Sequence, residues 1–340
     1  TRKGDTAKVS FDSMIARGVR ERRYFNFIGY RRLAYTITGS ITVIGFVLIA
    51  FNGLNLGVDF RGGRSYVVAF NSPVVATDMK LALAEEFENS GTEVKTYGSS
   101  NVVKVTTSYL VDDESDGADE KVKGALITGL EKFTGLSFVE NDAKVDATHF
   151  SILSSSKVGA TIADDIKDSA FEAGLYSLIA IFLFILIRFK KWQFSTGAIV
   201  ATAHDALFVV AIFGIAGAIG FSFEIDQVFI AALLSIIGYS INDTVIIFDR
   251  IREYTGLGTS HDRLKVFNDA INSTLSRTLI TSGTTMIVVI VLLFFGGEVL
   301  RGFAFALFVG ILVGTFSSIF VAASVVYDLD KKQAVKPSIA

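Results

Sequence analysis

Six segments of this chain approach the roughly 20 consecutive apolar residues that a helix needs to cross a lipid bilayer. They lie near residues 33–53, 168–188, 196–220, 226–248, 274–295 and 302–326. Of the 340 residues, 51% are hydrophobic and 19% are charged, so the apolar share exceeds that of a soluble domain. The sequence therefore predicts a membrane protein with six transmembrane α-helices.

Basic residues indicate which side of the membrane each segment end faces. Arginines precede the first segment, and lysines or arginines follow the second, fourth and sixth, whereas the short links 221–226 and 296–301 carry only Arg301. The positive-inside rule then places both termini in the cytoplasm. We expect five regions: a cytoplasmic basic segment (1–32), the first helix (33–53), a periplasmic domain (54–160), a five-helix region (161–327) and a cytoplasmic tail (328–340).

The first thirty residues are basic and polar, without the apolar run of a cleavable signal peptide. Residues 9–32 mix apolar side chains with many arginines, which indicates either a segment at the membrane interface or a solvated tail. The chain begins at Thr1 rather than at Met. We therefore expect a fragment, a processed chain or the second half of a longer fused protein.

The loop between the first two segments predicts an α+β domain. Its expected elements alternate as strand, helix, strand, strand, helix and strand, at 64–70, 77–89, 93–97, 101–107, 118–133 and 136–140. This β-α-β-β-α-β order is typical of a ferredoxin-like fold, which serves many functions. We expect Thr77 or Asp78 to cap the first helix. Its expected inward side chains are Leu81, Leu83, Ala84 and Phe87.

An aspartate interrupts the fourth apolar segment. Asp243, preceded by Asn242, lies seven residues before Arg250, so about 10 Å of helix separates it from the cytoplasmic boundary. An ionisable residue inside a span costs about 2.5 to 3.5 kcal/mol on insertion scales, so it usually faces a protein interior and serves a function. We therefore expect Asp243 to have a partner inside the bundle.

The fifth segment supplies a candidate partner, Arg277. It begins a stripe with Thr281, Thr284 and Thr285 on one helical face. Because the fourth and fifth helices are antiparallel, Asp243 and Arg277 can face each other. One hypothesis is a proton-driven switch, in which protonation of the aspartate releases the arginine. The alternative is a static ion pair that fixes helix register, with the hydroxyls bonded to carbonyls of their own helix rather than to a file of water.

Three further polar groups are candidates. His204 and Asp205 lie about a third of the way into the third segment from its cytoplasmic end, as a proton relay or a structural pair. Asp226 is expected to cap the fourth helix, with proton entry as the alternative. An interfacial charge network is expected at the end of that helix, from Asp249, Arg250, Arg252 and Glu253. In the sixth segment, Gly310 and Gly314 have the spacing that permits close helix approach.

Composition narrows the chemistry further. The chain has no cysteine, which excludes a disulfide framework, a thiolate metal site and a thiol nucleophile. Nothing in the expected α+β domain resembles a catalytic set, so we expect no enzyme, no cofactor and no metal. The net charge of -2 argues neither for nor against nucleic acid, and we expect no nucleic-acid partner.

Several motifs carry a resemblance to a known family. From the N-terminus on, the motifs are Gly53–Gly63 (GLNLGVDFRGG), Val158-Gly159, His204-Asp205, Ile237–Glu253 (IGYSINDTVIIFDRIRE), Ser276-Arg277-Thr278, Thr281-Ser282 and Gly296–Phe303 (GGEVLRGF). By the order and spacing of these motifs the chain resembles the SecF family. Its members are the membrane subunits of the bacterial SecDF protein-export complex, which is related to resistance-nodulation-division transporters.

The resemblance implies six spans that form half of a pseudo-symmetric, twelve-span assembly in the bacterial inner membrane. The implied partners are SecD, as a separate chain or a fused half, the SecYEG channel, further accessory proteins such as YajC and YidC, and a translocating preprotein. The implied driving force is the proton-motive force. The family's proton-path aspartate and arginine fall on Asp243 and Arg277. The accessory candidates are Asn242, His204, Asp205, Thr281 and Thr285.

Two other functions remain open from the sequence. The chain could be a proton-coupled exporter of small molecules or lipids from the same superfamily, although a periplasmic domain of about 100 residues is small for that task. It could also stabilise the SecYEG complex as a purely structural partner.

Overall fold

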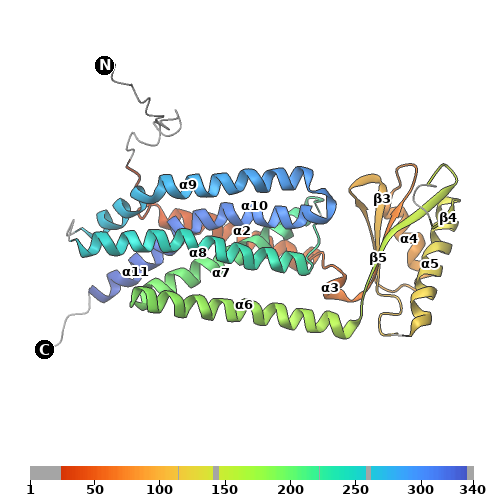
Figure 1. Cartoon of the computed structure of the whole chain (residues 1–340), viewed down its shortest axis with the longest axis horizontal. Helices are drawn as coiled ribbons and strands as arrows, with labels where there is room; N and C mark the ends of the chain where they lie inside the picture. The colour runs from red at the N-terminus through yellow and green to blue at the C-terminus, as the bar shows by residue number, and fades with distance from the viewer. Residues whose placement is uncertain (1–23, 114, 141–144, 222, 258–261, 335–340) are drawn as a thin grey trace, which may run out of the picture.

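The computed structural model describes residues 24–113, 115–140, 145–221, 223–257 and 262–334. The expectations for the basic segment up to residue 23 and for residues 335–340 fall outside these ranges. Within them the chain forms a bundle of long helices with a small α+β domain at one end (Figure 1). We refer to that end of the bundle as the domain end and to the opposite end as the distal end.

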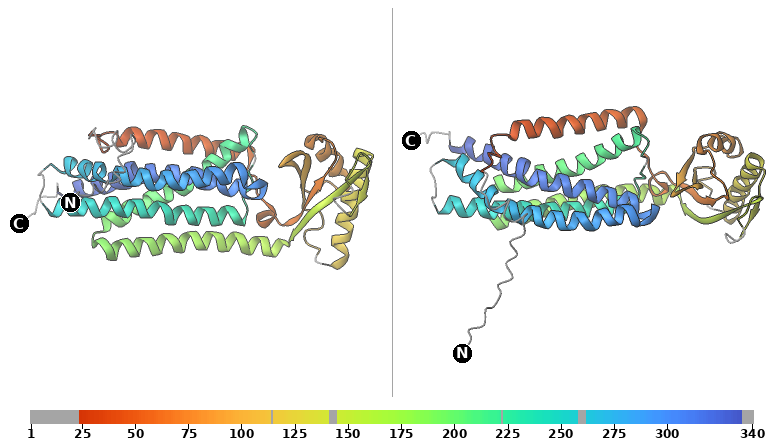
Figure 2. Two further views of the ribbon diagram at one scale, coloured as in Figure 1. Left: turned by 45° about the horizontal axis from the view of Figure 1, so that its top comes forward. Right: turned by 90° about the horizontal axis from the view of Figure 1, so that it is seen from above.

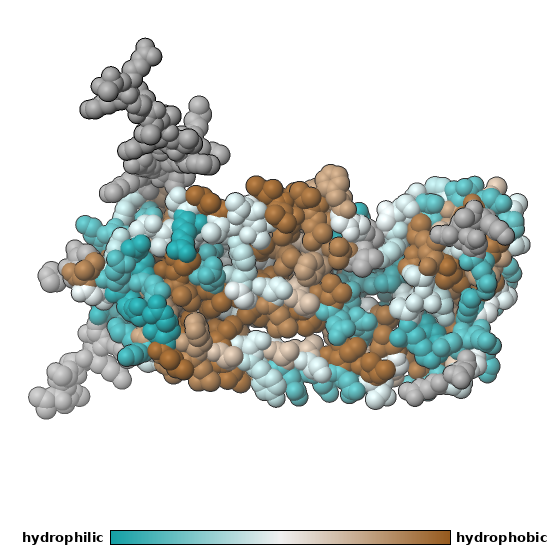
Figure 3. Space-filling view, in the orientation of Figure 1, coloured by the Kyte–Doolittle hydropathy of each residue, from teal (hydrophilic) through white to brown (hydrophobic). Residues whose placement is uncertain are grey.

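Among the described residues, six helices are long and apolar enough to cross a membrane, which confirms the predicted number. They are α2 (Arg31–Asn52), α6 (Ala160–Phe189), α7 (Trp192–Ala218), α8 (Gln227–Gly256), α9 (Arg263–Phe295) and a last span built from α10 (Gly297–Ser317), the π-helical segment η2 (Ser318–Ala322) and α11 (Ala323–Ala334). Apolar side chains cover the middle of the bundle, and polar ones gather at its distal end and over the α+β domain (Figure 3).

Two spans begin earlier than hydropathy predicts. Helix α6 starts at Ala160 rather than near residue 168, because the strand before it leads straight into the helix. Helix α9 starts at Arg263 rather than near residue 274, with Asp262 as a side-chain cap. Both extensions contain charged residues, so they escape a search for uninterrupted apolar runs. Helix α6 lies along the flank of the bundle and reaches the α+β domain (Figure 2).

Small residues set the packing at the centre of the bundle. Helix α7 lies between α2, α6, α8 and α10. A Cβ on Gly310 would lie 2.3 Å from the Ile236 side chain, and one on Gly314 would lie 2.9 Å from the Cβ of Ser240. Only glycine permits this approach of α10 to α8, which confirms the interpretation of the Gly310 and Gly314 spacing.

The α+β domain is a five-stranded sheet covered by two helices on the face away from the bundle (Figure 1). Its elements are β1 (Gly63–Ala69), α4 (Ala76–Glu86), β2 (Thr92–Tyr97), β3 (Ser99–Thr107), α5 (Asp116–Thr134), β4 (Ser137–Val139) and β5 (His149–Val158). The strand order is β2-β3-β1-β5-β4, with β4 parallel to β5 and the other pairs antiparallel.

Three details of the predicted domain are wrong. The sheet has a fifth strand, β5, which pairs with β1 in the place where a ferredoxin-like fold has its fourth and last strand. Helix α4 follows Val75 and has no side-chain cap, so neither Thr77 nor Asp78 caps it. Leu81 is 69% exposed, because the buried face of this segment follows Met79, Leu83 and Phe87.

A second connection ties the α+β domain to the bundle. After α2 the chain forms a short bridge beside the α7–α8 link, where the Gly57 amide donates to the Ile225 carbonyl at 2.9 Å. In the short helix α3 (Val58–Arg61), Asp59 Oδ2 accepts from the backbone amide of Gln227 at 3.0 Å. Lys104 on β3 forms an ion pair with Glu224. We call this set of contacts the latch, and it involves residues 224–227, immediately before and at the start of α8.

Candidate functional site

Asp243 lies in the interior of the bundle, as expected. It is 2% exposed, on the face of α8 that also buries Ile236, Ser240 and Ile247. Its partner is a hydroxyl on α9: Ser282 Oγ donates to Asp243 Oδ2 at 3.2 Å. Thr315 on α10 in turn donates to Ser282 Oγ at 2.7 Å. The Asp243 carboxylate on α8 is therefore linked to α9 by the Ser282 hydroxyl and, through Ser282, to α10 by the Thr315 hydroxyl.

Arg277 does not form the direct ion pair that antiparallel packing predicts. Its side chain is exposed, and it makes no ion pair with Asp243 in the part of the chain that the structure describes. Arg277 lies on α9 five residues before Ser282, the residue that contacts Asp243. The inward face of α9 follows Thr274, Thr278 and Ser282 instead, which leaves Arg277 on the outside.

The predicted hydroxyl stripe bonds mainly within its own helix. Thr281 donates to the Arg277 carbonyl at 3.1 Å, and Thr284 donates to the Ile280 carbonyl at 3.0 Å. Thr285 donates to the Thr281 carbonyl and also accepts from the Tyr239 hydroxyl on α8 at 3.1 Å. These bonds match the alternative in which the hydroxyls serve carbonyls of their own helix.

Asp205 is the second carboxylate buried in the bundle. It lies 13 residues after the first residue of α7 and 13 before the last, so it sits at mid-helix rather than a third of the way in. It has 0% exposure. Its Oδ1 lies 3.1 Å from His204 Nδ1, and its Oδ2 accepts from Ser240 Oγ at 2.7 Å and from Ser317 Oγ at 2.8 Å.

One stretch of the last span touches both carboxylate sites. Thr315 reaches Asp243 through Ser282, and Ser317 donates to Asp205. Ser318 exchanges a hydrogen bond with Thr244 at 2.8 Å and opens the π-helical segment η2. Single-turn π segments inside helices frequently lie at functional sites. Sequence reasoning did not single out these serines, since no local pattern shows which residue of another helix they meet.

Several exposed residues on α8 and α9, the two helices that the Ser282–Asp243 bond joins, are polar or small, and we call them together the polar strip. On α8 it contains Ser235, Gly238 and Asn242, and on α9 it contains Ser273, Ser276, Arg277 and Thr284. Polar side chains within a membrane span usually face protein or water rather than lipid. The strip therefore has the character of a surface that another protein covers.

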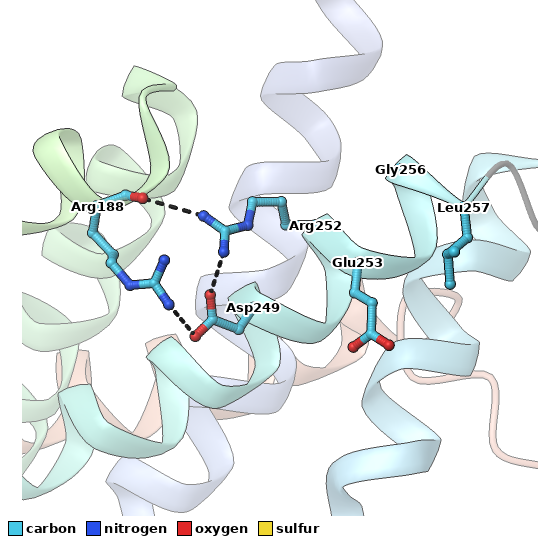
Figure 4. Close-up of a pocket in the computed structure, with 6 residues that line it drawn as sticks. All are labelled: Arg188, Asp249, Arg252, Glu253, Gly256 and Leu257. Atoms are coloured by element: carbon cyan, nitrogen blue, oxygen red, sulfur yellow. Dashed lines mark hydrogen bonds and ion pairs between the residues drawn. The ribbon is translucent and has the colours of Figure 1, made fainter.

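The polar groups at the two ends of α8 have structural partners. Asp226 caps the helix by accepting from the Phe229 amide at 2.8 Å, as predicted. Asp226 precedes the span, and burial raises its pKa, helped by Asp59 and Glu224 and opposed by the Phe229 bond. The distal end carries the predicted charge network: Arg188 and Arg252 flank Asp249 at 3.0 and 3.3 Å beside a pocket of about 450 Å³ (Figure 4).

The described residues contain no group of three or more His, Asp or Glu side chains arranged to hold a metal ion. The polar groups gathered at mid-bundle are carboxylates, hydroxyls, one imidazole and one nearby guanidinium. These groups can bind and release protons and exchange hydrogen bonds. The fold and this site together define a multi-pass membrane protein with ionisable groups at the centre of its bundle.

Comparison with known proteins gives the family. Residues 139–332 match the family described as "Protein export membrane protein SecD/SecF, C-terminal", and residues 47–74 match the "SecD/SecF GG Motif". The chain belongs to the SecD/SecF family of protein-export membrane proteins. It is 40% identical over 321 residues to the protein translocase subunit SecF of Rhodothermus marinus, which covers 94% of this chain and 98% of that protein.

Other relatives agree. The protein translocase subunit SecF of Vibrio alginolyticus is 31% identical over 94% of this chain and 95% of its own length. The crystal structure of SecDF, a translocon-associated membrane protein from Thermus thermophilus, superimposes with a TM-score of 0.75 at 32% identity. That match covers 91% of this chain but only 39% of the SecDF chain. The predicted resemblance to SecF is confirmed.

Proposed function

We propose that this chain works with SecD in the bacterial inner membrane as a non-enzymatic subunit that couples the proton-motive force to preprotein export. The observation that carries the proposal is Asp243, a buried carboxylate that accepts a hydrogen bond from the neutral Ser282 hydroxyl of α9, the helix that also carries Arg277. Membership of the SecD/SecF family supports it. The partners beyond SecD are the SecYEG channel and further accessory proteins such as YajC and YidC.

Asp243 takes and releases the proton in this proposal. In this proposal the charged carboxylate is stabilised by the Ser282 hydroxyl and by the positive charge of Arg277 on the same helix. Protonation removes the attraction to Arg277 while the neutral Ser282 contact can persist, so α8 and α9 can repack. A membrane potential supplies about 2.3 kcal/mol per charge per 100 mV, enough to bias two helix arrangements.

The partner surface in this proposal is the exposed polar strip on α8 and α9. A second membrane chain that covers the strip would enclose Arg277 and Asn242 next to Asp243. The SecDF chain supports this, because it is more than twice as long as the part that this chain matches. SecD, separate or fused, is the partner we propose for the strip.

The topology is proposed from charge. The basic residues at the distal end, Arg188 and Arg252 among them, are placed in the cytoplasm by the positive-inside rule. Residues 54–160 are then periplasmic, where the α+β domain would contact the emerging preprotein. Both termini are cytoplasmic in this arrangement.

The test exchanges Asp243 for Asn in membrane vesicles that carry this chain together with SecD and SecYEG. We expect gradient-dependent preprotein release to fall to the level measured without a proton gradient. Asp249→Asn is the matched control, since it neutralises a carboxylate of the same helix outside the mid-bundle site. Arg277→Ala is expected to remove coupling and Arg277→Lys to retain part of it. If preprotein release from Asp243→Asn vesicles depended on the proton gradient as strongly as in the wild type, the proposal would be wrong.

A further inference from the structure

A second set of ionisable groups in the bundle is not used by the function proposed above. His204 and Asp205 lie on α7, on the other side of α10 from Asp243 as judged by the residues each contacts. We propose that His204 and Asp205 form a second proton-binding site, coupled to Asp243 through α8 and α10. The coupling rests on the proposed role of Asp243, whereas the proton-binding site does not.

The contacts of Asp205 distinguish it from a structural ion pair. The groups that face its carboxylate are the His204 imidazole from α7, the Ser240 hydroxyl from α8 and the Ser317 hydroxyl from α10, and no lysine or arginine contacts it within the described ranges. The only titratable partner is therefore an imidazole. Imidazole is the side chain whose charge normally changes between about pH 5 and pH 8.

The geometry identifies the atom that receives the proton. In neutral His204 the Nδ1–H donates to Asp205 Oδ1 at 3.1 Å, which fixes the tautomer and leaves a lone pair on Nε2. Nε2 is buried and has no hydrogen-bond partner among the described residues. A proton that binds there creates an imidazolium beside Asp205, and the carboxylate stabilises the new charge, as the aspartate of a catalytic triad does for its histidine.

The coupling runs through two helices. Asp205 Oδ2 holds Ser240, three residues before Asp243 on α8, and Ser317, two residues after Thr315 on α10. Thr315 in turn donates to the serine that contacts Asp243. When His204 becomes charged, Asp205 binds the imidazolium more strongly and the two serines less strongly. The π-helical register that begins at Ser318 gives α10 a place to adjust.

The test uses the small number of histidines. The chain contains three, His149, His204 and His261, so the double variant His149→Gln, His261→Gln leaves His204 as the single imidazole. Nitrogen-15 NMR of this protein in lipid nanodiscs reports the tautomer and charge of His204 directly. We expect the Nδ1–H tautomer at the alkaline end of a pH series and the imidazolium at its acid end.

Variants then assign the partners. Asp205→Asn is expected to reduce the imidazolium-to-neutral ratio at a given pH by about tenfold or more, because the stabilising charge is gone. If the Asp205→Asn protein does not fold, Ser317→Ala is measured instead. That change is expected to raise the imidazolium-to-neutral ratio of His204 at least twofold. Ser177→Ala is the control, because the Ser177 hydroxyl on α6 donates to the Ala173 carbonyl of its own helix. A His204 that stays in one state across the range, or that ignores Asp205→Asn and Ser317→Ala, overturns the site.

A last variant isolates the coupling. Asp243→Asn is expected to change the His204 ratio about twofold or more at constant pH, through the shared contacts of α8 and α10. An unchanged ratio overturns the coupling and leaves the second site intact. The NMR measurements of His204 do not depend on protein export. The vesicle assay can therefore contradict the proposed function of Asp243 without contradicting the second proton-binding site, and the NMR titration can do the reverse.

Discussion

The α+β domain and the transmembrane bundle both bury ionisable side chains, but they stabilise them differently. In the domain, the Arg64 side chain is 3% exposed and forms an ion pair with Asp119 at 2.6 Å, and it donates to the carbonyls of Tyr109 and Leu110. In the bundle, Asp243 and Asp205 are contacted by hydroxyls and one imidazole.

The ion pair of the domain and the hydroxyl contacts of the bundle respond differently when one of the charged groups becomes neutral. An ion pair between opposite charges leaves a buried charge unpaired if its partner is neutralised, which is strongly destabilising. A hydroxyl can donate to a carboxylate or to the carbonyl oxygen of a neutral carboxylic acid alike. The domain therefore holds its buried charge fixed, whereas in the bundle the Ser282 contact of Asp243 can persist when that carboxylate becomes neutral.

The largest effect is expected from Arg64→Leu. This change removes the ion pair and both hydrogen bonds to the loop after β3. The Leu110 carbonyl still accepts from the Asp113 amide, whereas the Tyr109 carbonyl loses the Arg64 donor. We expect the free energy of unfolding of the domain to fall by about 3 kcal/mol, measured by amide hydrogen exchange in β1 and β3 of the full chain. Arg61→Leu is the matched control and is expected to cost less than about 1 kcal/mol, because its pair with Glu93 is exposed. Equal losses of unfolding free energy in Arg64→Leu and Arg61→Leu would show that the buried ion pair stabilises the domain no more than the exposed one.

The second-largest effect is expected from low pH, which lowers the folding stability of the α+β domain. Hydrogen bonds from Lys157 and Arg64 lower the pKa of Asp119, and bonds from Thr148 and His149 lower the pKa of Asp146 to about 2. Each pKa is lower in the folded than in the unfolded chain, so each carboxylate stabilises the folded domain above its unfolded pKa of about 3.9. That stability is lost as the pH falls through the folded pKa. Exchange protection of β1 should be constant from pH 7 to 5 and decline below about pH 4; a decline that begins near pH 6 would contradict this assignment.

Neutralising Asp243 is expected to have a smaller effect on stability. In Asp243→Asn the Ser282 hydroxyl can still donate to the amide oxygen, so we expect a change in unfolding free energy of about 1 kcal/mol or less. Thermal unfolding of the protein in nanodiscs measures it. A loss as large as that of Arg64→Leu would show that the bundle, too, depends on a fixed charge.

The smallest effect is expected from the latch. Lys104→Gln removes an ion pair between partly exposed side chains, which is worth about 0.2 to 1 kcal/mol. Stability should hardly change, but the distance distribution between spin labels on α5 and at the domain end of α8 should broaden. Lys95→Gln, on the same sheet and paired with Glu93, is the control. Identical distributions in both variants would show that the ion pair does not hold the domain in place.

The sequence predicted the six spans and the burial of Asp243, because long apolar runs and an isolated carboxylate are strong local signals. It missed β5, since the run from Leu153 to Lys157 is mostly serine and is typical of a loop. Those residues form a strand because β1 offers them a partner along most of its length. A contact between distant segments decides this element, and local propensity cannot show it.

The partners of the buried carboxylates were missed for a similar reason. Periodicity placed Arg277 and Thr281 on one face of α9, but which face meets α8 depends on the rotation of the helix, and that is fixed by Thr274, Thr278 and Ser282 packing inward. Ser240 and Ser317 reach Asp205 only because Gly314 allows α10 to lie against α8. A single sequence contains no signal for either arrangement.

The latch has a mechanical consequence. The α+β domain is joined to the bundle by the chain after α2, by the direct passage from β5 into α6, and by the contacts at Asp59 and Lys104 with the start of α8. A body supported at three separate points cannot swing freely about one pivot. Helix α8 runs about 24 Å from Gln227 to Asp243, so a tilt of about 5° about Asp243 displaces its first turn by about 2 Å. A tilt of α8 would therefore displace the contacts at Asp59 and Lys104, and with them the α+β domain.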